Sequence, residues 1–202
     1  MIHYPLRKMK EAGVADVIVV TEPSSAGRFA EYLGSGARYG LRLAFRVQDE
    51  PGGVAQALAL AEPFVAPGER LLVLLGYNLF EDSLGPYVRA FGEGKDKAFV
   101  FLKKVRDPRR YGVPAFRGDG RIAAVEEKPV RPRSEYGVTG IYLYDRSVFD
   151  VIRSIRPRNE ASWKSRTSTI VTPSAASWDM RFCVAGGRMR ARRNPGLKRI
   201  CG

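Results

Sequence analysis

Two segments place polar side chains at the ends of expected strands, where open α/β sheets carry their chemistry. In "QDEPGGVAQA", Gln48 ends a strand and Gly53 opens the helix that follows. A glycine at a helix start lets a ligand approach backbone N–H groups, and the Gln48 amide, which both donates and accepts, suits the edge of a base. A plain strand–turn–helix connection would give the same spacing.

The second segment is "VEEKP", in which Lys128 follows Glu127. A lysine here would contact phosphate as a point charge, and Glu127 would accept hydrogen bonds from sugar hydroxyls. The segments "RYGV" and "YGVTG" each place a glycine beside an aromatic residue, a pairing suited to a sugar pocket. Taken singly, these patterns are more often explained by a solvated strand end and by turn glycines with core tyrosines.

A third loop, in "LGYNLF", follows a buried strand and begins with Tyr77 and Asn78. A carboxylate would be the natural side chain at this position in a protein that handles phosphate and metal. A phenol with a pKa near 10 is a poor ligand for Mg²⁺, which prefers anionic oxygen. We therefore expect no intact metal site at Tyr77.

Hydrophobic periodicity and turn residues predict the elements that would position these loops. Helices are expected at 5–13, 24–34, 52–65, 84–91 and 147–155, and strands at 14–20, 41–48, 70–76, 97–105 and 136–145, with two short strands joined by a Gly-Asp-Gly turn within 111–130. The alternation of strands and helices predicts an α/β fold with a mostly parallel sheet and helices on both faces.

Composition divides the chain of 202 residues into two regions. Of the net charge of +13, much lies in residues 161–202, where nine Lys or Arg face one acid, Asp179. Both cysteines and both tryptophans also lie there, and their spacing predicts neither a disulfide framework nor a zinc site. No apolar run reaches the roughly 18 residues of a membrane span, and no signal peptide is apparent, so we expect a cytoplasmic protein without membrane contact.

The motifs together are more specific than any one of them. The segments "MIHYPL", "AGVADVIVV", "QDEPGGVAQAL", "LGYNLF", "DPRRYGVPAF" and "VEEKPVRPRSEYGVTGIYLYD" occur in this order. Residues 1–158 therefore resemble the sugar-1-phosphate nucleotidyltransferase family, and within it the members that use thymidine nucleotides. The resemblance implies a Rossmann-like, mixed and mostly parallel sheet. It also implies the reaction of dTTP with glucose 1-phosphate, which gives dTDP-glucose and pyrophosphate.

The resemblance also implies roles for individual residues, together with Mg²⁺ as cofactor and a homotetramer as assembly. Positions that match the family's base pocket are Gln48, Pro51, Gly53 and Val54; those around the sugar are Asn78, Tyr111, Gly112, Glu127 and Val138; and Lys128 matches the catalytic lysine on the sugar phosphate.

The chain departs from the family's pattern at three places that bear on its activity. The family's phosphate loop, of the form G-x-G-x-R-L, and the lysine after it do not occur in this chain, so we expect an incomplete fold. Tyr77 stands where the family has the aspartate that binds magnesium. The family's "GELEITDVN" is also missing after residue 158. We therefore expect this chain to be inactive.

The missing motif reappears when the coding frame of the tail is shifted. Residues 161–172 have synonymous codons which, read one base out of frame, encode "GELEITDVNNRY". We therefore interpret 1–158 as a partial nucleotidyltransferase domain and 159–202 as an out-of-frame, disordered basic tail. A basic tail that binds nucleic acid is the less favoured interpretation, because clustered aromatics and a basic helix are not evident. A transferase that uses UTP, CTP or GTP would also fit the motifs, as would a non-catalytic remnant.

Overall fold

The structure is a computed structural model that describes residues 2–154 and the backbone of residues 180–185. The helices predicted from the sequence are confirmed. They are α1 (His3–Glu11), α2 (Pro23–Leu33), α3 (Gly53–Ala59), α4 (Gly85–Glu93) and α5 (Val148–Ser154), with the 3-10 turns η1 (Ala37–Tyr39), η2 (Glu62–Phe64) and η3 (Pro108–Arg110). The predicted helix at 52–65 divides into α3 and η2, because Pro63 lacks an N–H and its ring crowds the carbonyl four residues earlier.

The strands form three hydrogen-bonded sheets in the described part of the chain. They are β1 (Asp16–Thr21), β2 (Arg42–Val47), β3 (Arg70–Leu74), β4 (Ala98–Lys104), β5 (Gly112–Phe116), β6 (Ile122–Glu127), β7 (Tyr136–Asp145) and β8 (Met180–Ala185). Strands β1 and β2 form a parallel pair, β5 and β6 form an antiparallel hairpin, and the central sheet has the order β3-β7-β4-β8.

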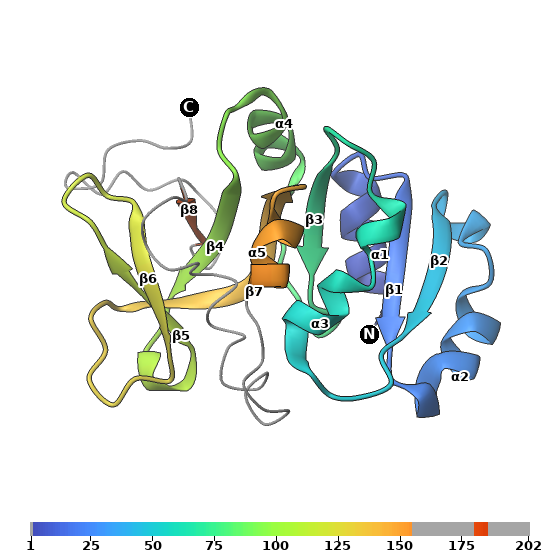
Figure 1. Cartoon of the computed structure of the whole chain (residues 1–202), viewed down its shortest axis with the longest axis horizontal. Helices are drawn as coiled ribbons and strands as arrows, with labels where there is room; N and C mark the ends of the chain where they lie inside the picture. Colours follow the sequence, from blue (N-terminus) through green and yellow to red (C-terminus); the bar gives the residue numbers. More distant parts are fainter. Residues whose placement is uncertain (1, 155–179, 186–202) are drawn as a thin grey trace.

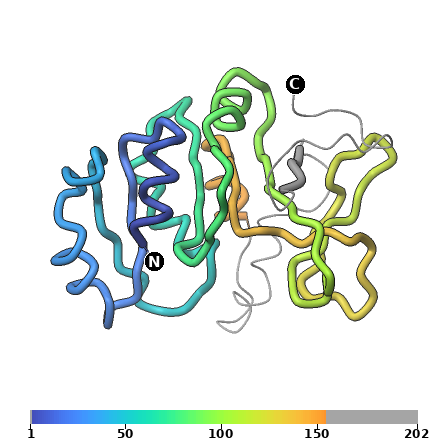
Figure 2. Tube along the Cα trace, turned by 180° about the vertical axis from the view of Figure 1, so that it is seen from behind, coloured from blue at the N-terminus to red at the C-terminus, as the bar shows by residue number. Residues whose placement is uncertain are grey.

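The direction of β7 makes the central sheet mixed. Strand β7 lies antiparallel between β3 and β4, and β8 pairs parallel to β4. The Rossmann-like mixed α/β class is therefore confirmed, although the direct pairing is less parallel than the sequence predicted. Helices cover both faces: α3 and α5 lie in front of the sheets in Figure 1, whereas α1 lies behind them and comes forward in Figure 2.

The core is divided in the same way as the sheets. One cluster of buried residues joins α3, α5, β4, β6 and β7, and includes Leu58, Val125 and Phe149. A second lies between α4 and the strands β3, β4 and β7. A third joins α1, α2, β1 and β2, and includes Leu6 and Val19. The β1–β2 layer thus has a hydrophobic core of its own.

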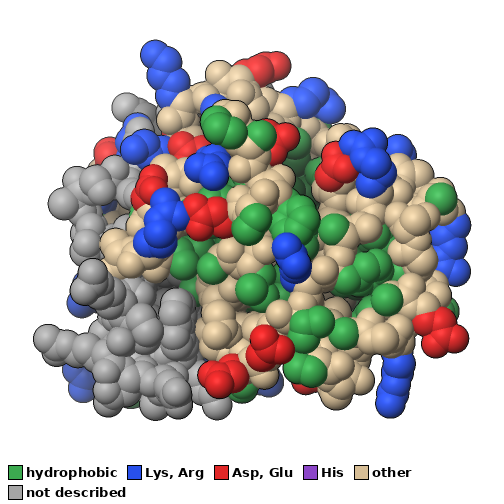
Figure 3. Space-filling view, turned by 45° about the vertical axis from the view of Figure 1, so that its right-hand side comes forward, with side chains coloured by type: hydrophobic (Ala, Val, Ile, Leu, Met, Phe, Trp, Pro, Cys, Tyr) green, Lys and Arg blue, Asp and Glu red, His purple; other side chains and the backbone are tan. Residues whose placement is uncertain are grey.

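The predicted tail is mostly outside the described residues. Six of its residues form β8. The expected disorder of the tail stays a prediction. The frameshift interpretation and the boundary at residue 158 fall outside the described range and stay predictions. None of the helices among the described residues combines the length and hydropathy that crossing a membrane requires. Figure 3 shows hydrophobic side chains reaching the surface over much of one face, with charged side chains around them.

Candidate functional site

A network of side-chain and backbone hydrogen bonds surrounds Gln48, directly after β2. The backbone N–H of Gln48 donates to the carbonyl of Thr21 at 2.8 Å, which ties the carboxyl ends of β2 and β1 together. Its side-chain Nε2 donates to the carbonyl of Gly53 at 3.2 Å and to Oε1 of Gln56 at 2.6 Å. The predicted pair of Gln48 and Gly53 is therefore in direct contact. Gln56 of the same motif, to which the sequence assigned no role, joins it.

Two glycines make this network possible, each for a different reason. Gly53 has a φ of +82°, a conformation that strains residues with a Cβ. Gly52 has an ordinary φ, but a Cβ on it would lie 2.2 Å from Oε1 of Gln56. Pro51 and Val54 flank these glycines in the chain, Pro51 exposed and Val54 half-buried.

A second cluster forms where the β5–β6 hairpin meets β7. Gly112 pairs with Glu127 across the hairpin, and a Cβ on Gly112 would lie 3.3 Å from Oε2 of Glu127 and 3.6 Å from Cγ2 of Val138. The ring of Tyr111 lies against the backbone of Gly137, where a Cβ would come within 2.9 Å of it. The hairpin thus brings together four of the predicted sugar-site residues.

Lys128 follows this hairpin in an unusual conformation. Its backbone N–H donates to the carbonyl of Tyr111 at 3.0 Å. Its φ of +46° makes it the one non-glycine residue with a positive φ in the part of the chain that the structure describes. A left-handed conformation at a lysine costs free energy and is typical of residues whose position matters for function. The side chain is exposed beside Glu127, as a phosphate ligand requires.

The loop after β3 joins the second cluster through Asn78. Nδ2 of Asn78 donates to the carbonyl of Gly140 at 3.1 Å, and the N–H of Leu75 donates to the same carbonyl at 3.1 Å. Gly140 has a φ of +76°, and a Cβ there would lie 2.6 Å from Leu75 Cδ1. The sequence had not indicated Gly140, whose place opposite the loop depends on the register of β7 against β3.

Tyr77 lies on this loop with 65% of its surface exposed. Partial burial, and then the negative charge of Glu127, raise the pKa of the Tyr77 phenol. Burial, then the negative charge that Tyr77 carries once it is ionised at high pH, and then the charge of Glu127, likewise raise the pKa of Tyr142. Tyr77 therefore lies within electrostatic reach of both residues and is a neutral phenol at physiological pH.

The donor atoms near Tyr77 do not fit a magnesium ion. Mg²⁺ binds through carboxylates and keeps near-octahedral oxygen coordination. Within residues 2–154, no group of three or more His, Cys, Asp or Glu side chains is arranged to hold a metal. The side chain at the expected ligand position is a protonated phenol.

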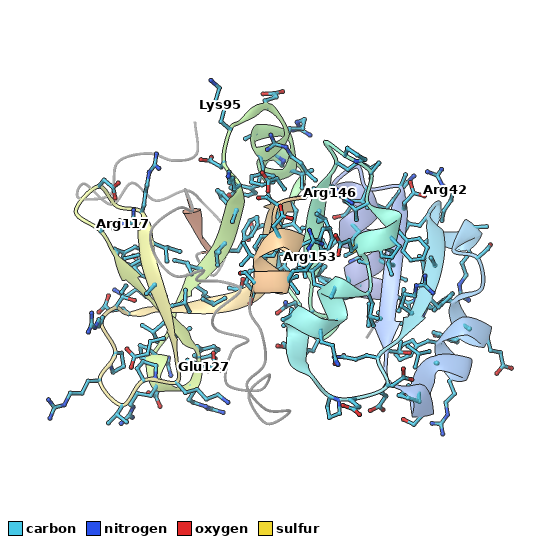
Figure 4. All side chains as sticks on the ribbon, viewed as in Figure 1. Arg42, Lys95, Arg117, Glu127, Arg146 and Arg153 are labelled. Carbon is cyan, nitrogen blue, oxygen red and sulfur yellow. The ribbon has the colours of Figure 1, made fainter. Side chains whose placement is uncertain are left out.

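Both clusters lie toward the same edge of the molecule. The arrowheads of β1, β2 and β3 point toward the lower edge of Figure 1, so the segment that follows β2 begins at that edge. Glu127 also lies toward the lower edge in Figure 4, whereas Arg42, the first residue of β2, lies near the upper edge. Helix α3 and strand β6 share one hydrophobic core, which holds the two clusters on a common support.

Comparisons with known proteins agree on one family. The model of the family described as nucleotidyl transferase matches residues 1–177. Among curated proteins, the glucose-1-phosphate thymidylyltransferase of Actinoplanes sp. is 43% identical over 158 residues, which are 78% of this chain and 52% of that protein. The protein of the same name from Neisseria meningitidis is 34% identical over 78% of this chain and 54% of its own length. The chain thus spans about half the length of these relatives.

A solved structure gives the same result for the fold. A Bacillus anthracis protein described as a putative glucose-1-phosphate thymidylyltransferase, crystallised with sucrose, superposes with a TM-score of 0.81. It is 36% identical in sequence, and the match covers 92% of this chain and 74% of that one.

Proposed function

Because the chain belongs to the nucleotidyl transferase family, we propose that its two clusters recognise the two ends of a dTDP-sugar, the product of thymidylate transfer from dTTP to glucose 1-phosphate. The contact of Gln48 with Gly53 and Gln56 is the observation that most supports a built base site. The names of the relatives, all glucose-1-phosphate thymidylyltransferases, support the choice of substrates. Cytoplasmic location and assembly as a homotetramer stay predictions.

The reaction whose substrates these clusters would recognise is an in-line displacement at phosphorus. A phosphate oxygen of glucose 1-phosphate forms a bond to the α-phosphorus of dTTP, and the bond to the pyrophosphate leaving group breaks. Gln48, with Gly53, Pro51 and Val54 around it, would hold the thymine. Glu127 would accept hydrogen bonds from sugar hydroxyls beside Gly112. The clusters would thus position the two reactants, and positioning is a main source of rate enhancement in such transfers.

The sugar phosphate would be held next to the sugar site. Lys128 would bring its positive charge next to that phosphate. Asn78, Tyr111 and Val138 would lie around the sugar. No step of this proposal passes through Mg²⁺, since the side chains around Tyr77 do not fit that ion.

A non-catalytic role is favoured by one observation. The neutral phenol of Tyr77 stands where the resemblance expects a carboxylate for the metal. We therefore propose that this chain binds the substrates of thymidylyl transfer without detectable turnover. Its two sites would then act in recognition alone.

Equilibrium titration of the full chain with dTTP, UTP, CTP, GTP and glucose 1-phosphate tests this proposal. We expect dTTP to bind more tightly than CTP and GTP, and no dTDP-glucose to form with Mg²⁺. Gln48→Ala should weaken dTTP binding about tenfold and leave glucose 1-phosphate unaffected, and Glu127→Ala should do the reverse. If CTP or GTP binds most tightly, the base site is specific for that nucleotide and not for dTTP. Product above a no-enzyme control would reject the non-catalytic role.

A further inference from the structure

The hydrogen bonds around Gln56 determine which way its side-chain amide points. Oε1 of Gln56 accepts a hydrogen bond from the backbone N–H of Gly52 at 3.0 Å and another from Nε2 of Gln48 at 2.6 Å. A backbone N–H can only donate, so the atom of Gln56 that faces Gly52 must be its oxygen. The same oxygen faces Gln48, and the amide of Gln56 therefore has one orientation rather than two.

The orientation of Gln48 follows from that of Gln56. Nε2 of Gln48 faces two acceptors, Oε1 of Gln56 and the carbonyl of Gly53 at 3.2 Å. Only the nitrogen of the Gln48 amide can satisfy both, because a carbonyl oxygen there would meet two other oxygens. Oε1 of Gln48 is left without a hydrogen-bond partner among the residues that the structure describes. The half-buried side chain therefore offers an acceptor to a ligand.

An oriented acceptor distinguishes pyrimidines by their N3 atoms. Thymine and uracil carry an N3–H, which donates a hydrogen bond, whereas cytosine has an unprotonated N3, which accepts one. A free glutamine amide would rotate to serve either base, because it has both a donor and an acceptor end. A site built to pair one hydrogen-bonding group rejects an analogue that leaves this group unpaired.

We propose that Gln56 is a positioning residue that holds the Gln48 amide with its oxygen toward the base, and so selects thymine or uracil over cytosine. This inference rests on the proposed function, because it assumes that Gln48 contacts the base. It assigns Gln56 a part in specificity without a contact between Gln56 and the ligand.

Gly52 gives the inference a second, independent variant. Its φ of −79° suits alanine, so Gly52→Ala introduces no backbone strain. The added Cβ would lie 2.2 Å from Oε1 and 2.4 Å from Cδ of Gln56, which is the flexible end of that side chain. The Gln56 amide must therefore move away, and Gln48 loses the partner that orients it.

The experiment measures dissociation constants for dTTP and dCTP with the full chain and three variants. Gln56→Leu and Gly52→Ala should each reduce the preference for dTTP over dCTP about tenfold, the effect of one hydrogen bond. Gln56→Glu keeps an oxygen acceptor for both N–H groups, so the preference for dTTP over dCTP should stay within about twofold. Its negative charge would weaken the binding of both nucleotides alike. By NMR, the side-chain NH₂ protons of Gln48 should exchange faster in Gln56→Leu than in Gln56→Glu.

The outcomes separate this inference from the proposed function. A wild-type preference for dTTP that persists unchanged in Gln56→Leu and Gly52→Ala would overturn the role of Gln56 alone. A wild-type chain that does not distinguish dTTP from dCTP would overturn the proposed base site, and the role of Gln56 with it. Slow exchange of the Gln48 amide in Gln56→Leu would contradict the orienting contact without reference to any nucleotide.

Discussion

At the scale of single residues, Tyr77 is the reason to expect substrate binding without catalysis. It lies within electrostatic reach of Glu127, and its pKa is raised by burial and by that carboxylate. The phenol is therefore neutral and cannot replace an anionic metal ligand. The same exposed ring stands beside the proposed sugar site, where it would favour contact with a sugar over coordination of a cation.

Replacing Tyr77 should restore part of a metal site. With dTTP bound, Tyr77→Asp should bind Mn²⁺ at least about tenfold more tightly than the wild type, because it adds a carboxylate at the position where the resemblance expects the metal ligand. Water-proton relaxation or the electron paramagnetic resonance signal of Mn²⁺ measures this. Tyr77→Phe is the matched control, since it keeps the ring and adds no charge. Equal Mn²⁺ affinity in the aspartate and phenylalanine variants would contradict the explanation.

The residues of the site were predictable to different degrees. Gln48 and Glu127 stand at strand ends and Gly53 at the start of a helix, which are places that sequence patterns locate. The contact of Gln48 with Gln56 crosses a turn, and its geometry depends on the close approach that Gly52 allows. No periodic pattern in the sequence indicates such a contact. Gly140 could not be predicted either, because its place beside Asn78 depends on pairing across sixty-two residues.

At the scale of elements, the loop between β3 and α4 is held at both ends. On one side Asn78 bonds to β7. On the other, the buried Lys8 of α1 donates from Nζ to the carbonyls of Glu81 at 2.7 Å and Asp82 at 3.2 Å. The N–H of Phe80 also donates to the hydroxyl of Tyr4 at 3.1 Å. The α1 helix thus fixes the loop that carries Tyr77 and Asn78.

Removing the buried ammonium should loosen this loop. Lys8→Met leaves two carbonyls without their charged donor, so the free energy of unfolding should fall by about 1.5–3 kcal/mol. Amide exchange at Phe80 should rise in the same variant. Lys10→Met is the control, because exposed Lys10 makes one bond, to the carbonyl of Gly40 at 2.8 Å, and should change stability by less than about 0.5 kcal/mol. Similar effects of both variants on Phe80 exchange would refute the role of Lys8.

The elements themselves were largely predictable, and their connections were not. Apolar runs located β1, β3 and β4, and alternation of apolar and polar residues located β2. Both patterns reflect which faces of a strand are buried. The same patterns do not encode strand direction. The insertion of β7 between β3 and β4 therefore appeared only in the structure.

At the scale of the whole molecule, the proposed function depends on two separate clusters acting as one site. The Gln48 cluster follows the β1–β2 layer, and the Glu127 cluster belongs to the hairpin beside the central sheet. Their common support is the core shared by α3 and β6. If the two clusters bind the two ends of one ligand, a joined ligand should bind more tightly than either part, because its second contact is intramolecular.

Titration of the full chain with dTDP-glucose and with dTDP, in EDTA so that no metal takes part, tests this claim most directly. We predict one saturable site at which dTDP-glucose binds at least about tenfold more tightly than dTDP. Glu127→Ala should abolish this difference in affinity, while Gln48→Ala should weaken the binding of both ligands by the same factor. Equal affinities of the wild-type chain for dTDP-glucose and dTDP would contradict the proposal that the two clusters form one site.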